Sequence, residues 1–484
     1  MHTAIRWILI GLLPAVASSA TPSTLPAIQS PRPTPGVAAP LSVQQGHALI
    51  RIRGGRQGRL ILVLSSLGSP GRSYPVNLSL RASDRQLGRL PPLPGMPVRR
   101  LASSTSSPPL ITRPATLATP SHPPHKPRNT RVFDVPLLNG RPLDGGGTAR
   151  VRASLITSGS RVAVYCDDDS PQSSSIAELA QAVRDRLEHE VIPESNERVG
   201  PAVDVDGDGR LTVLLTPWLD ILQSGRTSVG GFVRAADFDR RRSPPHSNRT
   251  DLLYLNARLK VTNGLDDLLA HEYRHVVACS VRASGHLPPE EDWVHEGLAH
   301  LAEHTRTNIA HRTRAFLHNT ARNPLVVPDY YRAGQWRSHG ARGACYLFLE
   351  WCRQTQAPHL ERQLLHGRRS GVAALATTCD QPFRRLFRGF SVAMLYPSVA
   401  SGGDTAHVQN WDPACRRHEL ALKGTCSAFV DVSRLSGDQL IDVKADAAAS
   451  LQLTLVALPR PQPNRSVSNG TTGSSLPPST SAVP

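Results

Sequence analysis

The amino-acid sequence predicts an α+β protein with a central mixed domain between two small β domains. Two segments, 41–90 and 404–458, carry short runs in which apolar residues recur at every second position, the period of a half-buried strand. Residues 265–390 instead show the apolar spacing of helices. Apolar residues make up 39% of the chain, which excludes a wholly disordered protein.

Composition marks the boundaries between these domains. The chain has 484 residues, which suggests more than one domain, and its 42 Pro residues are clustered. Segments rich in Pro, Ser and Thr bury too little apolar surface to fold. We therefore predict a spacer at 21–40, a linker at 91–130 and a disordered tail at 459–484, which leaves 131–398 as the central domain.

All three domains contain apolar runs bounded by Gly or Pro, which are typical of strands. In the first β domain the predicted strands are 48–52, 60–64 and 76–80. In the central domain they are 151–156, 162–165, 211–215 and 252–255, followed by a helix at 265–279. In the C-terminal domain, which resembles a small sandwich, they are 420–422, 429–432, 440–443 and 451–455.

Residues 1–20 have the three parts of a secretory signal peptide. Arg6 supplies a positive charge, residues 7–17 form an apolar run, and small residues at positions 15 and 17 suit signal peptidase. The apolar run is well short of the roughly 20 residues that span a bilayer, and no later segment is long enough. We expect an exported protein, secreted or periplasmic, without a membrane span.

The net charge of +17 is typical of proteins that bind nucleic acids or other polyanions. However, only four of the 55 basic residues are Lys, and the Arg residues are spread along the whole chain. This pattern favours a general bias towards Arg in the composition over a localised surface that binds polyanions. We expect no specific nucleic-acid partner, and a polyanion-binding protein stays an alternative.

The pentad His271-Glu272-Tyr273-Arg274-His275 carries the strongest chemical signal. Residues four apart lie on the same face of a helix, so both histidines can bind one metal ion. Glu272 lies one residue further round the helix, off the metal but in reach of a water molecule, where a general base must lie. The pentad therefore predicts metal-assisted hydrolysis.

A third ligand is available at Glu296, in the segment Trp-Val-His-Glu-Gly-Leu-Ala at 293–299. Twenty residues separate His275 from Glu296, enough for a turn and a returning helix. HExxH followed by W-x-x-E-G-x-A is the signature of gluzincins, the zinc peptidases whose third ligand is Glu. The sequence resembles this family.

Three neighbouring segments narrow the resemblance. Residues 230–232 (Gly-Gly-Phe), 247–256 and 343–348 (Gly-Ala-Cys-Tyr-Leu-Phe) are similar to segments of the hyicolysin-type neutral metallopeptidases. The resemblance covers roughly 131–395 and implies a zincin-like fold for this part of the chain.

The resemblance also implies roles for individual residues. His271, His275 and Glu296 would bind zinc, and Glu272 would be the base. In related gluzincins a carboxylate on the same helix face as the third ligand supports a ligand His, and Glu303 stands at such a position here. A solvated charge on the helix is the alternative for Glu303.

The sequence departs from the family at the group that stabilises the oxyanion. Related enzymes place a Tyr or His beside the metal, and in the family an aromatic residue precedes the Gly-Ala at 343–344. Here that position is Arg342. The remaining candidates for this role are His339, Tyr330, Tyr331 and Tyr346, although a lone Tyr in such a helix is more often a core residue.

Two other groups of side chains compete for a metal. Glu296, His300 and His304 are spaced four apart, although exposed histidines on an amphipathic helix are the simpler expectation. Residues 204–209 (Asp-Val-Asp-Gly-Asp-Gly) copy the first half of a calcium-binding loop, but the twelfth position is Leu215 rather than Glu. Ca²⁺ is a second candidate cofactor there, and a polar turn is the expectation we favour.

These observations predict a secreted zinc-dependent endopeptidase that acts on a protein or peptide substrate. In this fold class the substrate adds as a strand to a sheet edge, which 252–255 or a neighbouring strand would supply. The alternative is a catalytically inactive extracellular binding or adhesion protein with a degenerate peptidase domain. The complete ligand set and Glu272 favour the enzyme.

Overall fold

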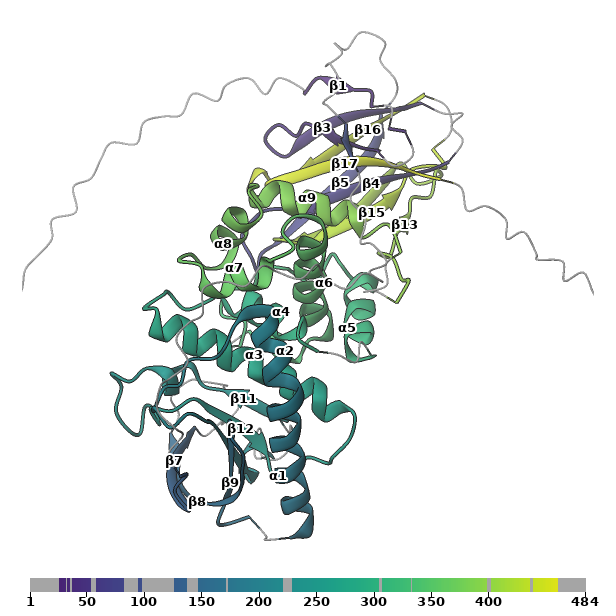
Figure 1. The fold of residues 1–484 in the computed structure, drawn as a ribbon. Coiled ribbons are helices and arrows are strands. Elements are labelled where there is room, and N and C mark those ends of the chain that lie inside the picture. Colours follow the sequence, from purple (N-terminus) through teal and green to yellow (C-terminus); the bar gives the residue numbers. More distant parts are fainter. Residues whose placement is uncertain are drawn as a thin grey trace, which may run out of the picture.

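The computed structural model describes residues 26–459 except 32, 35–36, 54–57, 82–94, 98–125, 137–146, 171–172, 221–228, 304–306, 332, 398–401 and 436–437. A β-sandwich, a group of helices and a six-stranded sheet follow one another along the molecule (Figure 1). The predicted signal peptide at 1–20, most of the predicted linker and the predicted tail beyond residue 459 lie outside the described residues. Within the described ranges, no helix has the length and apolar character needed to cross a membrane.

Strands from both ends of the chain form the β-sandwich, purple and yellow in Figure 1. One sheet has the order β1 (Ile28–Gln29), β3 (His47–Arg53), β16 (Asp438–Ala445), β5 (Ser73–Arg81) and β14 (Arg417–Lys423). The other has the order β13 (Gln409–Asn410), β15 (Ser427–Asp431), β4 (Arg59–Ser66), β17 (Leu451–Leu458), β2 (Val37–Leu41) and β6 (Met96–Pro97).

The sandwich differs from the prediction of two separate β domains at 41–90 and 404–458. Strand β16 pairs with both β3 and β5, and β17 pairs with both β4 and β2. The strands of the two segments interleave, in the order β3-β16-β5-β14 in one sheet and β15-β4-β17 in the other, so each segment completes the other's sheets. The predicted spacer also contributes, because β1 and most of β2 lie within 21–40.

This shared sandwich predicts that damage to a C-terminal strand unfolds the N-terminal strands as well. Ile441 of β16 is fully buried and faces Ile50 of β3 and Leu80 of β5 across the ladder. We expect Ile441→Ala to lower the free energy of unfolding by about 2–5 kcal/mol, and Lys444→Ala on the same strand to change it by less than about 0.5 kcal/mol. Limited proteolysis should then cut both segments together; cleavage confined to 404–458 would contradict a single sandwich.

The six-stranded sheet has the order β11 (Gly231–Val233), β12 (Leu252–Asn256), β10 (Leu211–Thr216), β9 (Val162–Asp167), β8 (Thr148–Ser158) and β7 (Thr130–Pro136). The strands predicted at 151–156, 162–165, 211–215 and 252–255 are confirmed, whereas β7 and β11 were not predicted. Strands β9, β10 and β12 are parallel to one another, and β11 runs antiparallel to β12 at one edge. Within the part of the chain that the structure describes, no strand pairs with β11 on the side away from β12.

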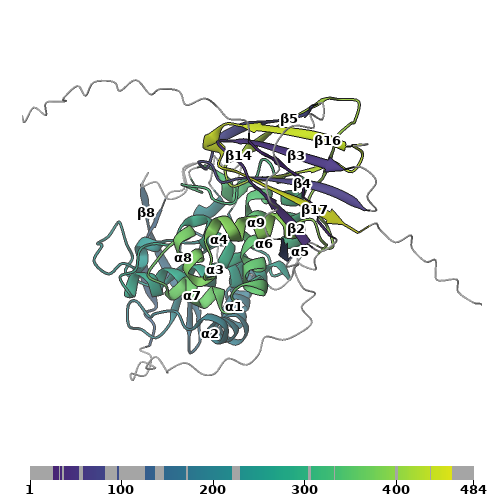
Figure 2. The ribbon, with the colours of Figure 1, turned by 90° about the horizontal axis from the view of Figure 1, so that it is seen from above.

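Helices fill the space between the sheet and the sandwich (Figure 1 and Figure 2). They are α1 (Ser174–Arg186), η1 (Leu187–Val191), α2 (Ile192–Val199), α3 (Gly264–Ser284), α4 (Asp292–His300), α5 (Thr307–His318), α6 (His339–Thr355), α7 (Leu360–His366), α8 (Gly371–Thr378) and α9 (Phe383–Ala393). The predicted helix at 265–279 is confirmed as part of α3, whose first turn carries Asp266 and Asp267. Acidic residues there stabilise the positive end of the helix dipole.

Helix α3 lies at the centre of the domain. It packs against β11 and β12 of the sheet and against α1, α2, α4 and α7. Most residues of α3, polar as well as apolar, are therefore buried. On the other side of the helical group, α9 packs against β4 and β17 of the sandwich.

Candidate metal centre

Helix α3 brings both histidines of the pentad and Glu272 into the interior. His271, Glu272 and His275 are each only 6% exposed. One helical turn separates the two histidines, and their rings meet edge to face with the two Nε2 atoms 3.3 Å apart. Two nitrogen atoms with available lone pairs thus converge on one point.

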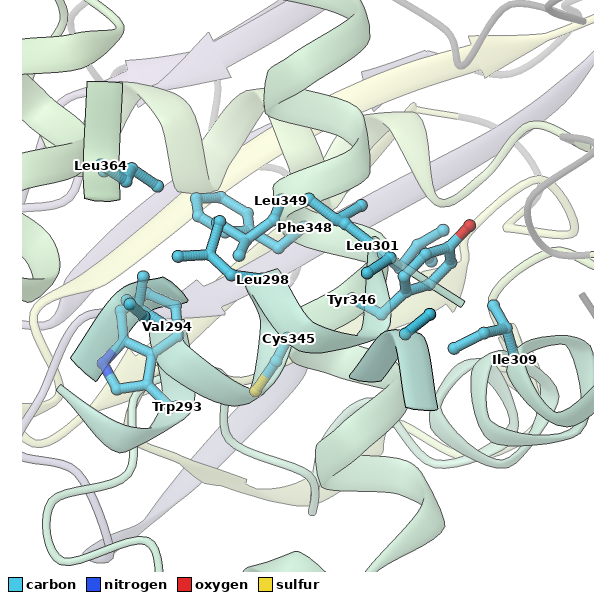
Figure 3. Packing of buried hydrophobic residues seen from close by; sticks show 14 of the residues in the cluster. Trp293, Val294, Leu298, Leu301, Ile309, Cys345, Tyr346, Phe348, Leu349 and Leu364 are labelled. Atoms are coloured by element: carbon cyan, nitrogen blue, oxygen red, sulfur yellow. The ribbon is translucent and has the colours of Figure 1, made fainter. Parts of the chain in front are cut away.

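Helix α4 adds Glu296 to this point. Its apolar face packs into the helical core through Val294, Leu298 and Leu301, as Figure 3 shows. The opposite face carries Glu296, whose Oε2 lies 3.7 Å from Nε2 of His271 and whose Oε1 lies 3.6 Å from Nε2 of His275. The amphipathic pattern of α4 therefore orients the third candidate ligand.

The spacing of these three groups fits a tetrahedral metal ion. Metal–ligand bonds of about 2.0–2.2 Å at tetrahedral angles place ligand atoms about 3.3–3.6 Å apart. The candidate ligand atoms of His271, His275 and Glu296 all lie within 4.8 Å of one another, and all three residues are buried. A metal ion would also compensate for burying a carboxylate beside two imidazoles.

Glu303 lies directly behind His271, so it is not the solvated charge that was the alternative. Its side chain is 4% exposed, and its Oε1 lies 3.1 Å from Nδ1 of His271. Burial alone would raise the pKa of Glu303, but His300 and His271 outweigh it and hold the pKa below its ordinary value. Glu303 is therefore a carboxylate that orients His271 through its far nitrogen.

The protonation of this network follows from Arg342. Its Nε donates a hydrogen bond of 3.0 Å to Nε2 of His300. Burial and the charge of Arg342 lower the pKa of His300 to about 3, so this ring is neutral. Because Nε2 accepts from Arg342, we place the proton on Nδ1, the atom that also lies 2.9 Å from Nη1 of Arg312. That proton is donated to Oε1 of Glu303 over 2.6 Å. Glu303 then accepts from Nδ1 of His271 as well, which leaves Nε2 of His271 free for a metal.

His300 differs from the expectation of an exposed histidine, because it is fully buried. His271, His300 and Glu303 form a second group with metal-ligating spacing. However, Arg312 Nη1 donates to both oxygens of Glu303, at 2.9 and 3.1 Å, and Arg342 donates to His300. Cations that already hold these groups disfavour a metal there. His304, the other residue of the rival set, lies outside the described residues.

Glu272 stands apart from these hydrogen bonds. Its Oε2 is buried and has no hydrogen-bond partner among the described residues. Burial raises the pKa of its carboxyl to about 7. A carboxylate with one oxygen free and a pKa near neutrality can accept a proton from water.

The structure separates the four candidates for the oxyanion group. The Tyr331 hydroxyl donates to Oε1 of Glu296 over 2.7 Å, so this side chain holds a candidate ligand. Tyr330 is fully buried, and its hydroxyl has no hydrogen-bond partner in the described part of the chain. Tyr346 packs in the hydrophobic cluster of Figure 3, and His339 stacks edge to face against His311.

The acidic loop at 204–209 forms a tight turn. The carboxylate of Asp204 accepts backbone hydrogen bonds from Gly207 and Gly209, at 2.7 and 2.9 Å. Asp204, Asp206 and Asp208 lie close enough to share a cation. Arg131 already contacts two of them, at 3.1 Å from Asp206 and 3.8 Å from Asp208. The guanidinium therefore supplies part of the positive charge that a calcium ion would bring.

The contact between Glu303 and His271 predicts a defined effect of Glu303→Gln. The amide can no longer accept charge-assisted hydrogen bonds from His271, His300 and Arg312 together. We expect metal affinity to fall about 10–100-fold while the ligand set stays complete. Metal titration by competition with a chromogenic chelator measures this loss, and an unchanged affinity would show that Glu303 does not support His271.

Comparison with known proteins gives one informative similarity. No protein family model matches the chain. The chain is 22% identical over 205 residues to the neutral metalloprotease ShpI of Staphylococcus hyicus. The similar region covers 40% of this chain and 45% of ShpI, so the chain spans less than half the length of this relative. The similarity indicates a distant relationship to metalloproteases.

Proposed function

We propose that the protein is a secreted zinc-dependent endopeptidase of the gluzincin class, with a zincin-like catalytic domain of the hyicolysin type. The spacing of His271, His275 and Glu296 is the observation that carries this proposal. Their ligand atoms lie 3.3, 3.6 and 3.7 Å apart, close to the spacing of about 3.3–3.6 Å around a tetrahedral zinc ion. The similarity to ShpI supports peptidase activity, and the signal-like segment at 1–20 supports export.

Each residue of the site would have a separate role in peptide hydrolysis. A bound zinc ion would supply Lewis acidity and lower the pKa of a water molecule to about 7. His271, His275 and Glu296 would hold the ion, and Tyr331 would fix the orientation of Glu296. Glu272 would take a proton from the attacking water and deliver it to the leaving amine.

The open edge of the six-stranded sheet is suited to bind an extended peptide. Among the described residues strand β11 pairs only with β12, so its outer backbone groups can pair with an added strand. A Cβ atom placed on Gly231 would lie 3.1 Å from Cγ of Glu272. The edge therefore passes beside the proposed base. It is β11, rather than the strand at 252–255, that would receive the substrate.

Because Gly231 lies this close to Glu272, Gly231→Ala should impair catalysis without removing a catalytic group. The methyl group would also meet Cδ2 of Leu255 at 2.9 Å, so the neighbours must move. We expect kcat/KM to fall about 10–100-fold through misplacement of Glu272. The matched control is Gly264→Ala at the start of α3, where a Cβ would meet only Thr262 Oγ1, at 3.7 Å. Equal activities of the two variants would contradict the assigned edge.

The proposed function is tested by metal removal and return. Purified protein should cleave casein, lose this activity in 1,10-phenanthroline, and regain it when about one equivalent of Zn²⁺ is added back. A protein that binds zinc but cleaves neither casein nor a mixed peptide library would support the alternative of an inactive binding protein. Failure to bind zinc would overturn the proposal.

A further inference from the structure

We propose that Arg342 stabilises the negative charge that develops on the carbonyl oxygen of the scissile peptide bond. The inference rests on the proposed function and deepens it by naming a further catalytic residue. Arg342 is the fourth residue of α6, and its side chain is partly exposed. It occupies the position at which the resemblance led us to expect an aromatic residue.

The guanidinium of Arg342 is held in place from one side. Its Nε donates to Nε2 of His300, and His300 is itself anchored by the 2.6 Å hydrogen bond to Glu303. Arg312 holds Glu303 from the other side. A planar guanidinium that is fixed at Nε has a defined orientation. It therefore loses little conformational entropy when its other nitrogens bind a partner.

The terminal amino groups of Arg342 are available to a substrate. Across the described residues, the structure shows no hydrogen bond from its Nη1 or Nη2 to another side chain. The ring nitrogen that accepts from Arg342, Nε2 of His300, lies 3.9 Å from Oε2 of Glu296. Arg342 therefore stands one side chain away from a proposed metal ligand.

The other candidates are either in contact with another group or enclosed in the core. Tyr331 donates its hydroxyl to Glu296, Tyr330 and Tyr346 are buried, and His339 contacts His311. Of the five residues, Arg342 alone combines a cationic group, held one side chain away from Glu296, with terminal N–H donors that no other described side chain accepts from.

The chemistry requires such a donor. As the oxygen of water bonds to the carbonyl carbon, the π electrons of the C=O bond move onto oxygen, and Glu272 takes the water proton. When the C–N bond breaks, those electrons re-form the carbonyl and the proton leaves with the amine. Arg342 donates hydrogen bonds only and takes no part in the proton transfer. A fixed N–H donor strengthens its bond to oxygen as the charge grows, which is how the transition state is favoured over the substrate.

The test compares zinc-loaded wild type with Arg342→Ala and Arg342→Lys. We expect Arg342→Ala to lower kcat about 10²–10³-fold with little change in KM, the usual effect of removing one such donor. Arg342→Lys should also lose at least about tenfold, because a single ammonium does not reproduce the planar fork. Added guanidinium ion should restore part of kcat to Arg342→Ala only. Arg314→Ala, an exposed arginine of α5 paired with Asp404, is the matched control.

A second readout does not depend on turnover. A phosphinic peptide carries an anionic tetrahedral centre, so its affinity for Arg342→Ala should fall in parallel with kcat/KM. Zinc-loaded Arg342→Ala with kcat near that of wild type would overturn the inference, and so would loss of zinc from this variant, which would assign Arg342 to holding the ligands. Wild type that binds no zinc or cleaves nothing would instead overturn the proposed function itself.

Discussion

Glu272→Gln should reduce kcat for casein cleavage by about 10²–10⁴-fold, the usual contribution of a general base. The amide has nearly the same shape but cannot accept a proton from water. Zinc content should stay at that of wild type, because Glu272 makes no contact with His271, His275 or Glu296 that holds them in place. Metal analysis and steady-state kinetics on the same preparations measure both quantities.

The control for this variant is Glu178→Gln on the exposed face of α1, which should match wild type. If Glu272→Gln retained more than about a tenth of the wild-type kcat, another group would have to act as the base. If it lost zinc, the loss of activity could not be assigned to proton transfer.

Glu296→Gln should strongly weaken metal binding and, at zinc concentrations that saturate wild type, remove cleavage. The carboxylate is the one anionic group among the three ligands, and the hydroxyl of Tyr331 would be left beside a neutral amide. We expect zinc affinity to fall by more than the roughly 10–100-fold typical of residues that only support a ligand. Isothermal titration with Zn²⁺ measures the loss.

Glu190→Gln, an exposed residue of η1, provides the comparison for Glu296→Gln. Activity of Glu296→Gln should return only at zinc concentrations far above those that saturate wild type. Wild-type zinc affinity in Glu296→Gln would show that His271 and His275 bind the metal with a different third ligand, and the proposed site would have to be redrawn.

The local parts of the site can be predicted from the sequence. The pairing of His271 with His275 depends only on helical periodicity, and α3 forms where that periodicity is found. The position of Glu296 next to the two histidines depends on a turn and an amphipathic helix, and the residues around Trp293 indicate both. These features need no knowledge of distant segments.

The residues that surround the ligands could not be found in this way. Arg312 and Arg342 come from α5 and α6, and they meet Glu303 and His300 only through tertiary packing. Among so many arginines, no sequence signal distinguishes these two from the rest. Only the replacement of an aromatic residue by Arg342 marked the position as unusual.

The same limit applies to the fold. The strands of the sandwich have clear alternation, but the pairing of β16 with β3 joins segments almost 400 residues apart and leaves no local trace. Strand β11 is three residues long and contains Gly231, so its pattern is too short to predict a strand. Its importance comes from its position beside Glu272, which only the folded chain reveals.

Anomalous diffraction at the zinc edge from crystals of the wild-type protein tests the central claim most directly. We predict one zinc peak, bonded to Nε2 of His271, Nε2 of His275 and the carboxylate of Glu296 at about 2.0–2.2 Å. A peak between His300 and Glu303 or among the carboxylates at 204–208 would contradict the assigned ligands. The absence of any peak after soaking in zinc would contradict the metal site itself.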